Sequence, residues 1–275
     1  MITKKGEKKM EVLEKFIFGK KQDKCEDGYY IDDDFIVVVD GVTSKGKKLW
    51  DGKTSGEYAK DIIINLFENI EKDISAEDLI LKLNSALYEA YSEILTSEEV
   101  NEFLRAGIII YSKFYNEIWS FGDLQCMINN EVFDHAKLID ELNSKMRSFA
   151  LEFYLNNGYT IDDIKKEDLG RNLIMPFLKM QQYFENKDGE FGYSVLNGQS
   201  INVKNIVKYK VKKGDIVVLA SDGYPKLFDN LSTSEEFLKE VLVSDPLCYK
   251  DNKSTKGLVE GNFSFDDRCY IKFIV

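Results

Sequence analysis

The chain has 275 residues, with 37 basic and 48 acidic side chains and a net charge of −11. A surface this acidic repels phosphate backbones and anionic lipids, so we expect neither a nucleic-acid partner nor a membrane partner. The single histidine, His135, excludes histidine-rich zinc sites and most nucleophiles that depend on a histidine base.

Residues 1–15 are basic but lack the apolar core of a secretory signal. The chain also has no apolar run of about eighteen residues, the length that spans a membrane. The four cysteines are widely spaced and form no C-x-x-C pair, which is typical of reduced thiols in the cytosol. We therefore expect a cytoplasmic protein.

A strand is predicted at 16–19, and a longer apolar run follows at 35–39. The second run is mostly β-branched and passes directly into Asp40 and Gly41. This predicts a strand that is buried on both faces and delivers a carboxylate to a turn. Two helices follow: a capping box of Thr54 and Glu57 begins the first, Ser75 begins the second, and each has one apolar face.

Strand patterns return at 106–114, 117–121 and 124–132, with turns at 115–116 and 122–123, which predicts an antiparallel meander. From about 134 to 190 the pattern is helical, and Thr160 with Asp163 forms a further cap. Apolar residues recur there at the helical period: Leu138, Leu142, Met146, Phe149 and Phe153. We therefore expect a helical insertion between sheet segments.

The last part of the chain repeats the Asp-Gly pattern. After strand patterns at 192–196 and 201–210, an apolar run at 216–220 closes on Asp222 and Gly223. A helix is predicted at 232–243 and a final strand at 269–275. Two buried strands that each end in Asp-Gly would bring two carboxylates together, and these repel by about 4 kcal/mol at intermediate dielectric. A cation between them would remove this repulsion.

Strands and helices come in blocks, so the predicted class is α+β. Five stretches, in this order, resemble the metal-dependent protein phosphatases of the PPM type, the protein phosphatase 2C-like family: Cys25-Glu26-Asp27, Val39-Asp40-Gly41, Gly122-Asp123, Ala220-Ser221-Asp222-Gly223 and Asp266-Asp267-Arg268. The resemblance implies a four-layer α-β-β-α sandwich of two antiparallel sheets flanked by helices. It also implies a single domain over 1–275 with the helical insertion at about 134–190.

The resemblance further implies a centre of two Mn²⁺ or Mg²⁺ ions and a third, weaker site. Asp40 would bridge both ions, and the carbonyl of Gly41 would complete one coordination sphere. Asp222 and Asp266 would hold the other ion, and Asp40 and Asp222 are the candidate catalytic residues. Carboxylates, carbonyls and water are hard ligands that suit these ions, and two ions that share a water can activate it for attack on phosphorus.

Further ligands are implied at the acidic pair Glu26 and Asp27, which would support the centre through water, and at Asp123, which would belong to the third site. A solvated turn is the alternative for the acidic pair. A hairpin turn is the alternative for Asp123.

The substrate side departs from the pattern of the family. Many members place a phosphate-binding arginine shortly before the acidic pair, and this chain offers only Lys21 and Lys24 there. Together with Lys45 they are the candidate substrate-binding residues, with a solvated surface as the alternative. Lysine presents a point charge rather than a two-pronged fork. We therefore expect metal binding to be kept and substrate choice to be altered.

The leading interpretation is a monomeric phosphatase that hydrolyses phosphoserine or phosphothreonine esters on a protein. A cognate kinase would phosphorylate the same protein. One alternative is a pseudophosphatase that binds metal or a partner, and another is a phosphatase for a small phosphorylated metabolite. A haloacid dehalogenase-type phosphatase is excluded, because it needs a nucleophilic aspartate two residues before Asp40 and Val38 stands there.

Overall fold

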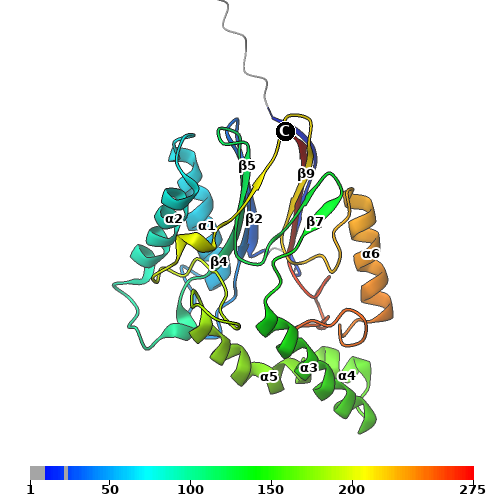
Figure 1. Cartoon of the computed structure of the whole chain (residues 1–275). Helices are drawn as coiled ribbons and strands as arrows, with labels where there is room; N and C mark the ends of the chain where they lie inside the picture. The colour runs from blue at the N-terminus through cyan, green and yellow to red at the C-terminus, as the bar shows by residue number, and fades with distance from the viewer. Residues whose placement is uncertain (1–9, 22–23) are drawn as a thin grey trace, which may run out of the picture.

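The computed structural model describes residues 10–21 and 24–275. In that part of the chain, ten strands form two antiparallel sheets, ordered β1-β10-β9-β6-β7 and β2-β3-β4-β5-β8, which pack face to face (Figure 1). The strands are β1 (Glu11–Phe18), β2 (Asp27–Ile31), β3 (Phe35–Gly41), β4 (Ala106–Ser112), β5 (Glu117–Phe121), β6 (Gln125–Ile128), β7 (Glu131–Phe133), β8 (Val207–Lys210), β9 (Ile216–Ala220) and β10 (Arg268–Ile274).

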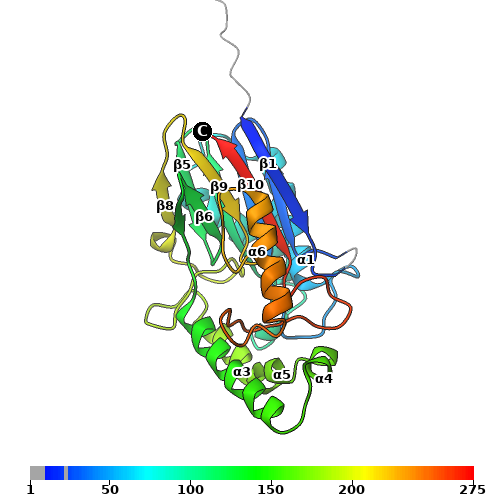
Figure 2. The ribbon, with the colours of Figure 1, turned by 90° about the vertical axis from the view of Figure 1, so that its right-hand side faces the viewer.

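Helices cover the outer faces of the sandwich. Helices α1 (Ser55–Leu66) and α2 (Ala76–Tyr91) lie against the sheet of β3, and α6 (Leu231–Ser244) lies against the sheet of β9 (Figures 1 and 2). This confirms the predicted α+β class and the α-β-β-α order of layers. Short 3-10 turns follow at Phe67–Asn69, Val100–Glu102, Gln181–Phe184 and Val203–Asn205.

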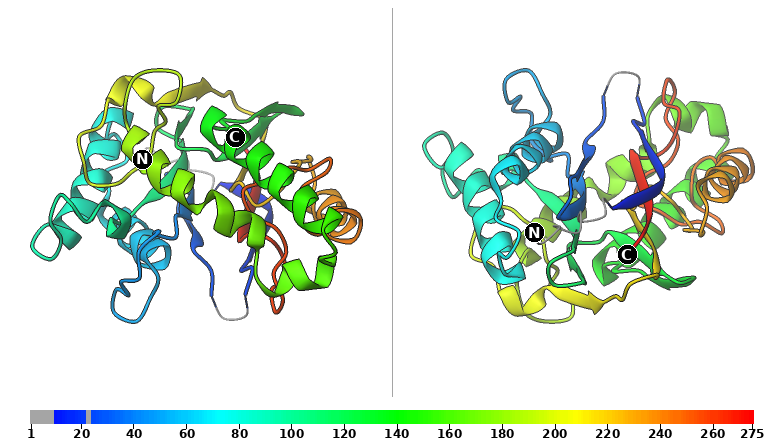
Figure 3. Two further views of the ribbon diagram at one scale, coloured as in Figure 1. Left: turned by 90° about the horizontal axis from the view of Figure 1, so that it is seen from below. Right: turned by 90° about the horizontal axis from the view of Figure 1, so that it is seen from above.

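Three further helices lie across one end of both sheets. They are α3 (Leu138–Asn156), α4 (Ile161–Lys166) and α5 (Leu169–Met180), the green helices in the left panel of Figure 3. They occupy the stretch for which the sequence predicts helices, and Thr160 and Asp163 form the expected capping box at the start of α4. Among the described residues, no helix is both long enough and apolar enough to cross a membrane.

Strands β3 and β9 are buried on both faces, as their sequences predict. In β3, Val37 and Val39 pack towards α1 and α2, whereas Ile36 and Val38 pack between the two sheets. In β9, Val217 and Leu219 face the space between the sheets, and Val218 and Ala220 face outward into a second cluster. Over 35–39 and 217–220 both faces are buried, so the first charged residue after each run lies where the chain leaves the core.

Local signals for helix starts are also confirmed. Thr54 accepts a hydrogen bond from the backbone N–H of Glu57 (3.2 Å), and the Glu57 carboxylate accepts one from the N–H of Thr54 (3.0 Å). Ser75 caps α2 in the same way by accepting from the N–H of Asp78 (3.1 Å). The four cysteines are free thiols.

The predicted meander is wrong at its third strand. Strands β4 and β5 pair with each other, but β6 pairs with β9 in the opposite sheet. The chain crosses between the sheets at Gly122, which has a φ of +128° and whose added Cβ would lie 2.8 Å from the Cα of Gly107. A side chain at this crossing would therefore collide with the backbone of β4.

Two other strand predictions need correction. The run at 124–132 is split into β6 and β7 by Asn129 and Asn130, which have φ values of 48° and 72° and form a tight hairpin. The run at 192–196 is not a strand, and it makes only isolated bridges, Ala106 with Leu196 and Glu185 with Tyr193. Periodicity alone does not distinguish a short strand from an extended loop that passes beside a sheet.

Candidate active site

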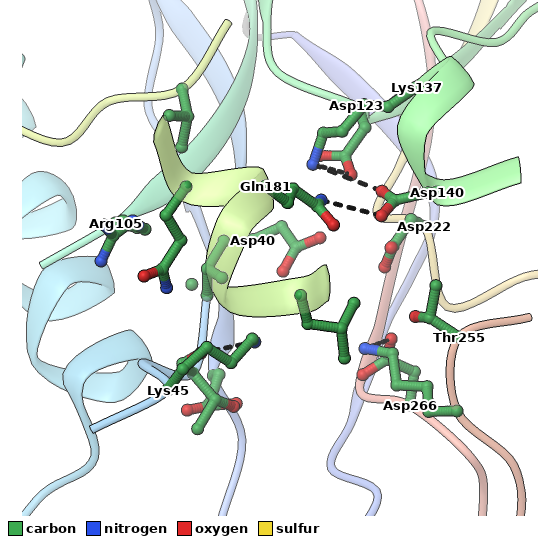
Figure 4. Close-up of a pocket in the computed structure, with 18 of the residues that line it drawn as sticks. Asp40, Lys45, Arg105, Asp123, Lys137, Asp140, Gln181, Asp222, Thr255 and Asp266 are labelled. Carbon is green, nitrogen blue, oxygen red and sulfur yellow. Dashed lines mark hydrogen bonds and ion pairs between the residues drawn. The ribbon is translucent and has the colours of Figure 1, made fainter. Parts of the chain in front are cut away.

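A cavity of about 130 Å³ lies where β3 leaves the sandwich, with α5 and the turn after it forming part of its wall (Figure 4). Both sheets, the loop after β3, the loop before β10 and the helices beneath contribute to this wall. Most of the side chains are charged or amide-bearing, among them Lys20, Glu26, Asp40, Lys45, Arg105, Asp123, Lys137, Asp140, Arg171, Gln181, Gln182, Glu185, Asp222, Lys256, Asp266 and Asp267.

Strand β3 delivers Asp40 and Gly41 to the cavity. Asp40 lies opposite Asp27 in the pairing of β3 with β2, and the N–H of Gly41 donates to the carbonyl of Glu26 at 3.0 Å. An added Cβ on Gly41 would lie 2.2 Å from the carbonyl oxygen of Gly56 and 2.6 Å from that of Glu26. Three backbone segments therefore meet here, and only glycine leaves room for them.

Asp40 and Asp222 face the same space from different strands (Figure 4). Burial and the negative charge of Asp222 raise the pKa of the Asp40 carboxyl well above its usual range. Although the Asp222 residue is exposed, the surrounding protein and the charge of Asp266 raise its pKa to about 7. Neither carboxylate has an ion-pair partner among the described residues, so the repulsion predicted from the sequence is present.

Asp266 and Asp123 also line the cavity, but each is paired with a lysine. The Lys256 ammonium contacts the Asp266 carboxylate, and Lys137 lies 2.6 Å from Asp123. Burial opposes ionisation of both carboxyls, but these cations outweigh it and lower the pKa of each. A metal ion bound by Asp266 or Asp123 would therefore compete with a lysine.

The acidic pair is divided between two environments. Glu26 lines the cavity, where its carboxylate accepts hydrogen bonds from the hydroxyls of Thr43 and Thr54 (2.6 Å for Thr54) and lies 3.3 Å from the Lys20 ammonium. Asp27 is buried behind the cavity wall and accepts a hydrogen bond of 2.5 Å from the Ser221 hydroxyl. Burial, with the nearby Asp266 and Asp267, raises its pKa, although the Ser221 hydrogen bond opposes this.

The donor atoms at the base of the cavity fit a hard divalent ion. In the described part of the chain, no three histidine, cysteine or acidic side chains converge closely enough to form a metal site by themselves. Asp40 and Asp222 nevertheless supply two carboxylates that form no ion pair within residues 10–21 and 24–275, and Gly41 lines the same cavity. Oxygen donors of this kind suit Mg²⁺ and Mn²⁺. The roles of all seven predicted ligands, Glu26, Asp27, Asp40, Gly41, Asp123, Asp222 and Asp266, stay predictions.

The three predicted substrate lysines are not in one place. Lys45 lines the cavity, and its ammonium donates to the carbonyl of Thr43 at 3.1 Å. Lys21 and Lys24 are exposed, form a β-bridge with each other and lie outside the cavity wall. Of the three predicted substrate lysines, the structure therefore brings only Lys45 to the cavity that Asp40 and Asp222 line.

Several cavity residues carry no signal in the sequence. Arg171, Gln181 and Gln182 come from α5 and the turn after it, where a helical pattern gives no indication of which polar residues point inward. The side-chain oxygen of Gln182 is buried and has no hydrogen-bond partner among the described residues. Lys20, Lys137 and Lys256 were likewise missed, because isolated lysines are usually solvated.

No protein-family model and no curated protein matches this sequence. Among solved structures, serine/threonine phosphatase Stp1 from Staphylococcus aureus is similar, with a TM-score of 0.51, 15% identity, and coverage of 98% of this chain and 96% of that chain. The crystal structure of a bacterial serine phosphatase gives a TM-score of 0.51, 16% identity, and coverage of 97% and 98%. At such identities the likeness shows the fold, and the fold that the sequence resemblance implies is confirmed.

Proposed function

We propose that this chain, which has the fold of serine/threonine phosphatases, is a metal-dependent phosphatase that hydrolyses phosphoserine or phosphothreonine esters. The observation that supports the proposal is that Asp40 and Asp222 line one cavity and that neither forms an ion pair with a described residue. Two such carboxylates are stabilised by a hard divalent ion between them.

Asp40, Asp222 and the carbonyl of Gly41 would hold the metal. When bound, two Mn²⁺ or Mg²⁺ ions would polarise the phosphoryl oxygens and activate a water for in-line attack. The two threonine hydroxyls and Lys20 orient the Glu26 carboxylate towards the same cavity. A third ion beside Asp123 would require release of Lys137.

We propose that the substrate is a phosphorylated protein and that a kinase adds the phosphate that this enzyme removes. We also propose that the enzyme is cytoplasmic and monomeric. A groove of about 780 Å³ adjoins the cavity and shares Asp222, Asp266 and Lys256 with it. It lies between the start of α3 and the loop at 250–256 and is much larger than the inner cavity. The groove therefore offers room for the peptide around a phosphorylated residue, which a small metabolite would not need.

The pairing of lysines with Glu26, Asp123 and Asp266 favours one alternative, a pseudophosphatase. In that case the lysines would take the place of metal ions at these carboxylates, and the fold would serve to bind a partner. The two functions differ in one measurable property, which is metal-dependent turnover.

The test is hydrolysis of phosphoserine and phosphothreonine peptides with added Mn²⁺ or Mg²⁺ and with EDTA. We expect EDTA to abolish hydrolysis and Asp40→Asn to lower kcat/KM at least about a hundredfold. Asp33→Asn, on an exposed residue outside the cavity, serves as the matched control and should keep full activity. Metal-independent hydrolysis at a similar rate would refute the proposal, and no turnover on any phosphopeptide, even where calorimetry detects Mn²⁺ binding, would favour the pseudophosphatase.

A further inference from the structure

The cations of the cavity fall into two groups. Among the described residues, six basic side chains line it: Lys20, Lys45, Arg105, Lys137, Arg171 and Lys256. Four of the six form ion pairs with carboxylates of the protein. The other two, Lys45 and Arg171, form none with any described residue, so their positive charges are not neutralised by the protein.

The four paired cations are each held by a carboxylate. Lys20 lies 3.3 Å from Glu26, Arg105 lies 2.5 Å from Glu185, Lys137 lies 2.6 Å from Asp123, and Lys256 contacts Asp266. These cations balance the acidic part of the cavity and have little capacity left for an external anion.

Arg171 keeps a free edge. Its Nη1 donates to the carbonyl of Thr255 at 2.7 Å, whereas its Nε and Nη2 have no hydrogen-bond partner among the described residues. Two adjacent N–H groups of a guanidinium match two oxygens of a phosphate in a bidentate pair. Such an edge inside a cavity is therefore suited to a tetrahedral oxyanion.

The electrostatics agree with this arrangement. Burial, together with the positive charges of Arg171, Lys256 and Arg105, lowers the pKa of the Lys45 ammonium to about 7. In contrast, the pKa of Lys256 is raised, because Asp266 and Asp222 outweigh its burial. Burial and neighbouring cations therefore disfavour the charged form of Lys45, and an anion bound beside Lys45 and Arg171 would stabilise it.

The position of Arg171 is fixed by a buried network. Asp168 caps α5 by accepting from the N–H of Arg171 (2.9 Å), and it forms a two-pronged ion pair with Arg147 (2.7 and 3.1 Å). Arg147 is fully buried and also donates to the carbonyl of Leu247 at 2.7 Å. Helix α5 is thereby tied to the loop that carries Thr255, so the guanidinium is held at the cavity before a ligand arrives.

We propose that Arg171, together with Lys45, binds the phosphoryl oxygens of the substrate and of the released phosphate. Arg171 would thus supply the guanidinium that is absent before Glu26, but from the helical insertion instead of from the sandwich. The inference rests on the proposed function for the identity of the ester, whereas binding of inorganic phosphate can be measured without turnover.

The experiment is calorimetric titration of inorganic phosphate into the full chain, with and without Mn²⁺. We expect the wild type to bind phosphate, Arg171→Ala to weaken binding at least about tenfold, and Arg171→Lys to weaken it less, because charge remains and the fork is lost. Lys179→Ala is the matched control, because it removes one exposed positive charge from the same helix outside the cavity, and it should bind like the wild type. Mn²⁺ affinity should not change in Arg171→Ala.

Two results would overturn the inference: no phosphate binding by the wild type, or binding by Arg171→Ala within twofold of the wild type. If Arg171→Ala fails to fold, Arg171→Gln keeps a donor for Thr255 and decides the question by the same criterion. Loss of phosphate binding in a protein that lacks turnover would support the inference while refuting the phosphatase. Turnover by the wild type, together with unchanged phosphate binding by Arg171→Ala, would support the phosphatase while refuting the inference.

Discussion

In strand β3 every side chain from 35 to 39 is buried and apolar, whereas helix α3 buries four polar residues beside Ala150 and Leu151 and leaves two phenylalanine rings exposed. Asn143, Ser144 and Arg147 are on the buried side of α3, while Phe149 and Phe153 are 75% and 56% exposed. Both elements have a regular hydrophobic pattern. The comparison teaches that such a pattern predicts the kind of element but not which of its faces the rest of the chain covers.

The two regions are therefore held by different forces. The sandwich is stabilised by burial of apolar area on both sides of its central strands. Helices α3–α5 contribute Leu151 and Ile164 to a small apolar cluster with Leu247 of the loop before β10. They are also held by the ion pair of Arg147 with Asp168 and by hydrogen bonds of these two residues to the same loop. Three substitutions separate these contributions.

The largest effect is expected from Asp168→Ala. This change leaves the fully buried Arg147 without its carboxylate and removes the cap of α5, so we expect the free energy of unfolding to fall by about 3–5 kcal/mol. Urea denaturation followed by circular dichroism measures it. Asp162→Ala, in an exposed ion pair of 3.7 Å with Lys165, is the control and should change it by less than about 1 kcal/mol. Equal effects of the two variants would mean that the network does not hold the insertion.

The next effect tests the sandwich. Ile109 lies on β4, fully buried between the two sheets, and Ile109→Ala should cost about 2–5 kcal/mol because it removes apolar contacts and leaves a cavity. The same denaturation experiment applies, with Ile94→Ala at a 55% exposed position as the control. A loss below about 1 kcal/mol would show that the space between the sheets is not tightly packed.

The smallest effect is expected on the exposed face of α3. Phe149→Ala should change the free energy of unfolding by less than about 0.5 kcal/mol, since the ring contacts little of the protein. Phe121→Ala, which truncates a ring that is 1% exposed, should cost about 3–5 kcal/mol and provides the contrast. A loss above about 2 kcal/mol for Phe149→Ala would mean that this face is covered in solution.

Helix starts and buried strands could be predicted from the sequence because their causes are local. Thr54 with Glu57 and Thr160 with Asp163 satisfy backbone groups within one turn, and the run at 35–39 has no polar residue to place in water. Sheet membership could not be predicted in the same way. The crossing at Gly122 depends on how closely Gly107 approaches from a neighbouring strand, and no local pattern records that approach.

The site divides along the same line. The sequence predicted that Asp40 and Asp222 lie together because each follows an apolar run, and both line the cavity. Arg171 and Gln182 were missed because their places in the cavity depend on how α5 packs, and not on the residues beside them. Lys21 and Lys24 are near the acidic pair in the sequence, yet they do not line the cavity. Proximity in the sequence therefore did not predict proximity in space.

The pairing of β1 with β10 has a consequence for synthesis. In this pairing Glu11 lies opposite Ile274 and Phe18 lies opposite Arg268. Strand β1 therefore cannot pair within its sheet until β10 has been synthesised. While the ribosome makes the chain between them, β1 and β9 each keep an edge with unpaired N–H and C=O groups, and such edges favour aggregation. Folding of the sheet that leads to Asp222 can therefore finish only once translation has passed β10.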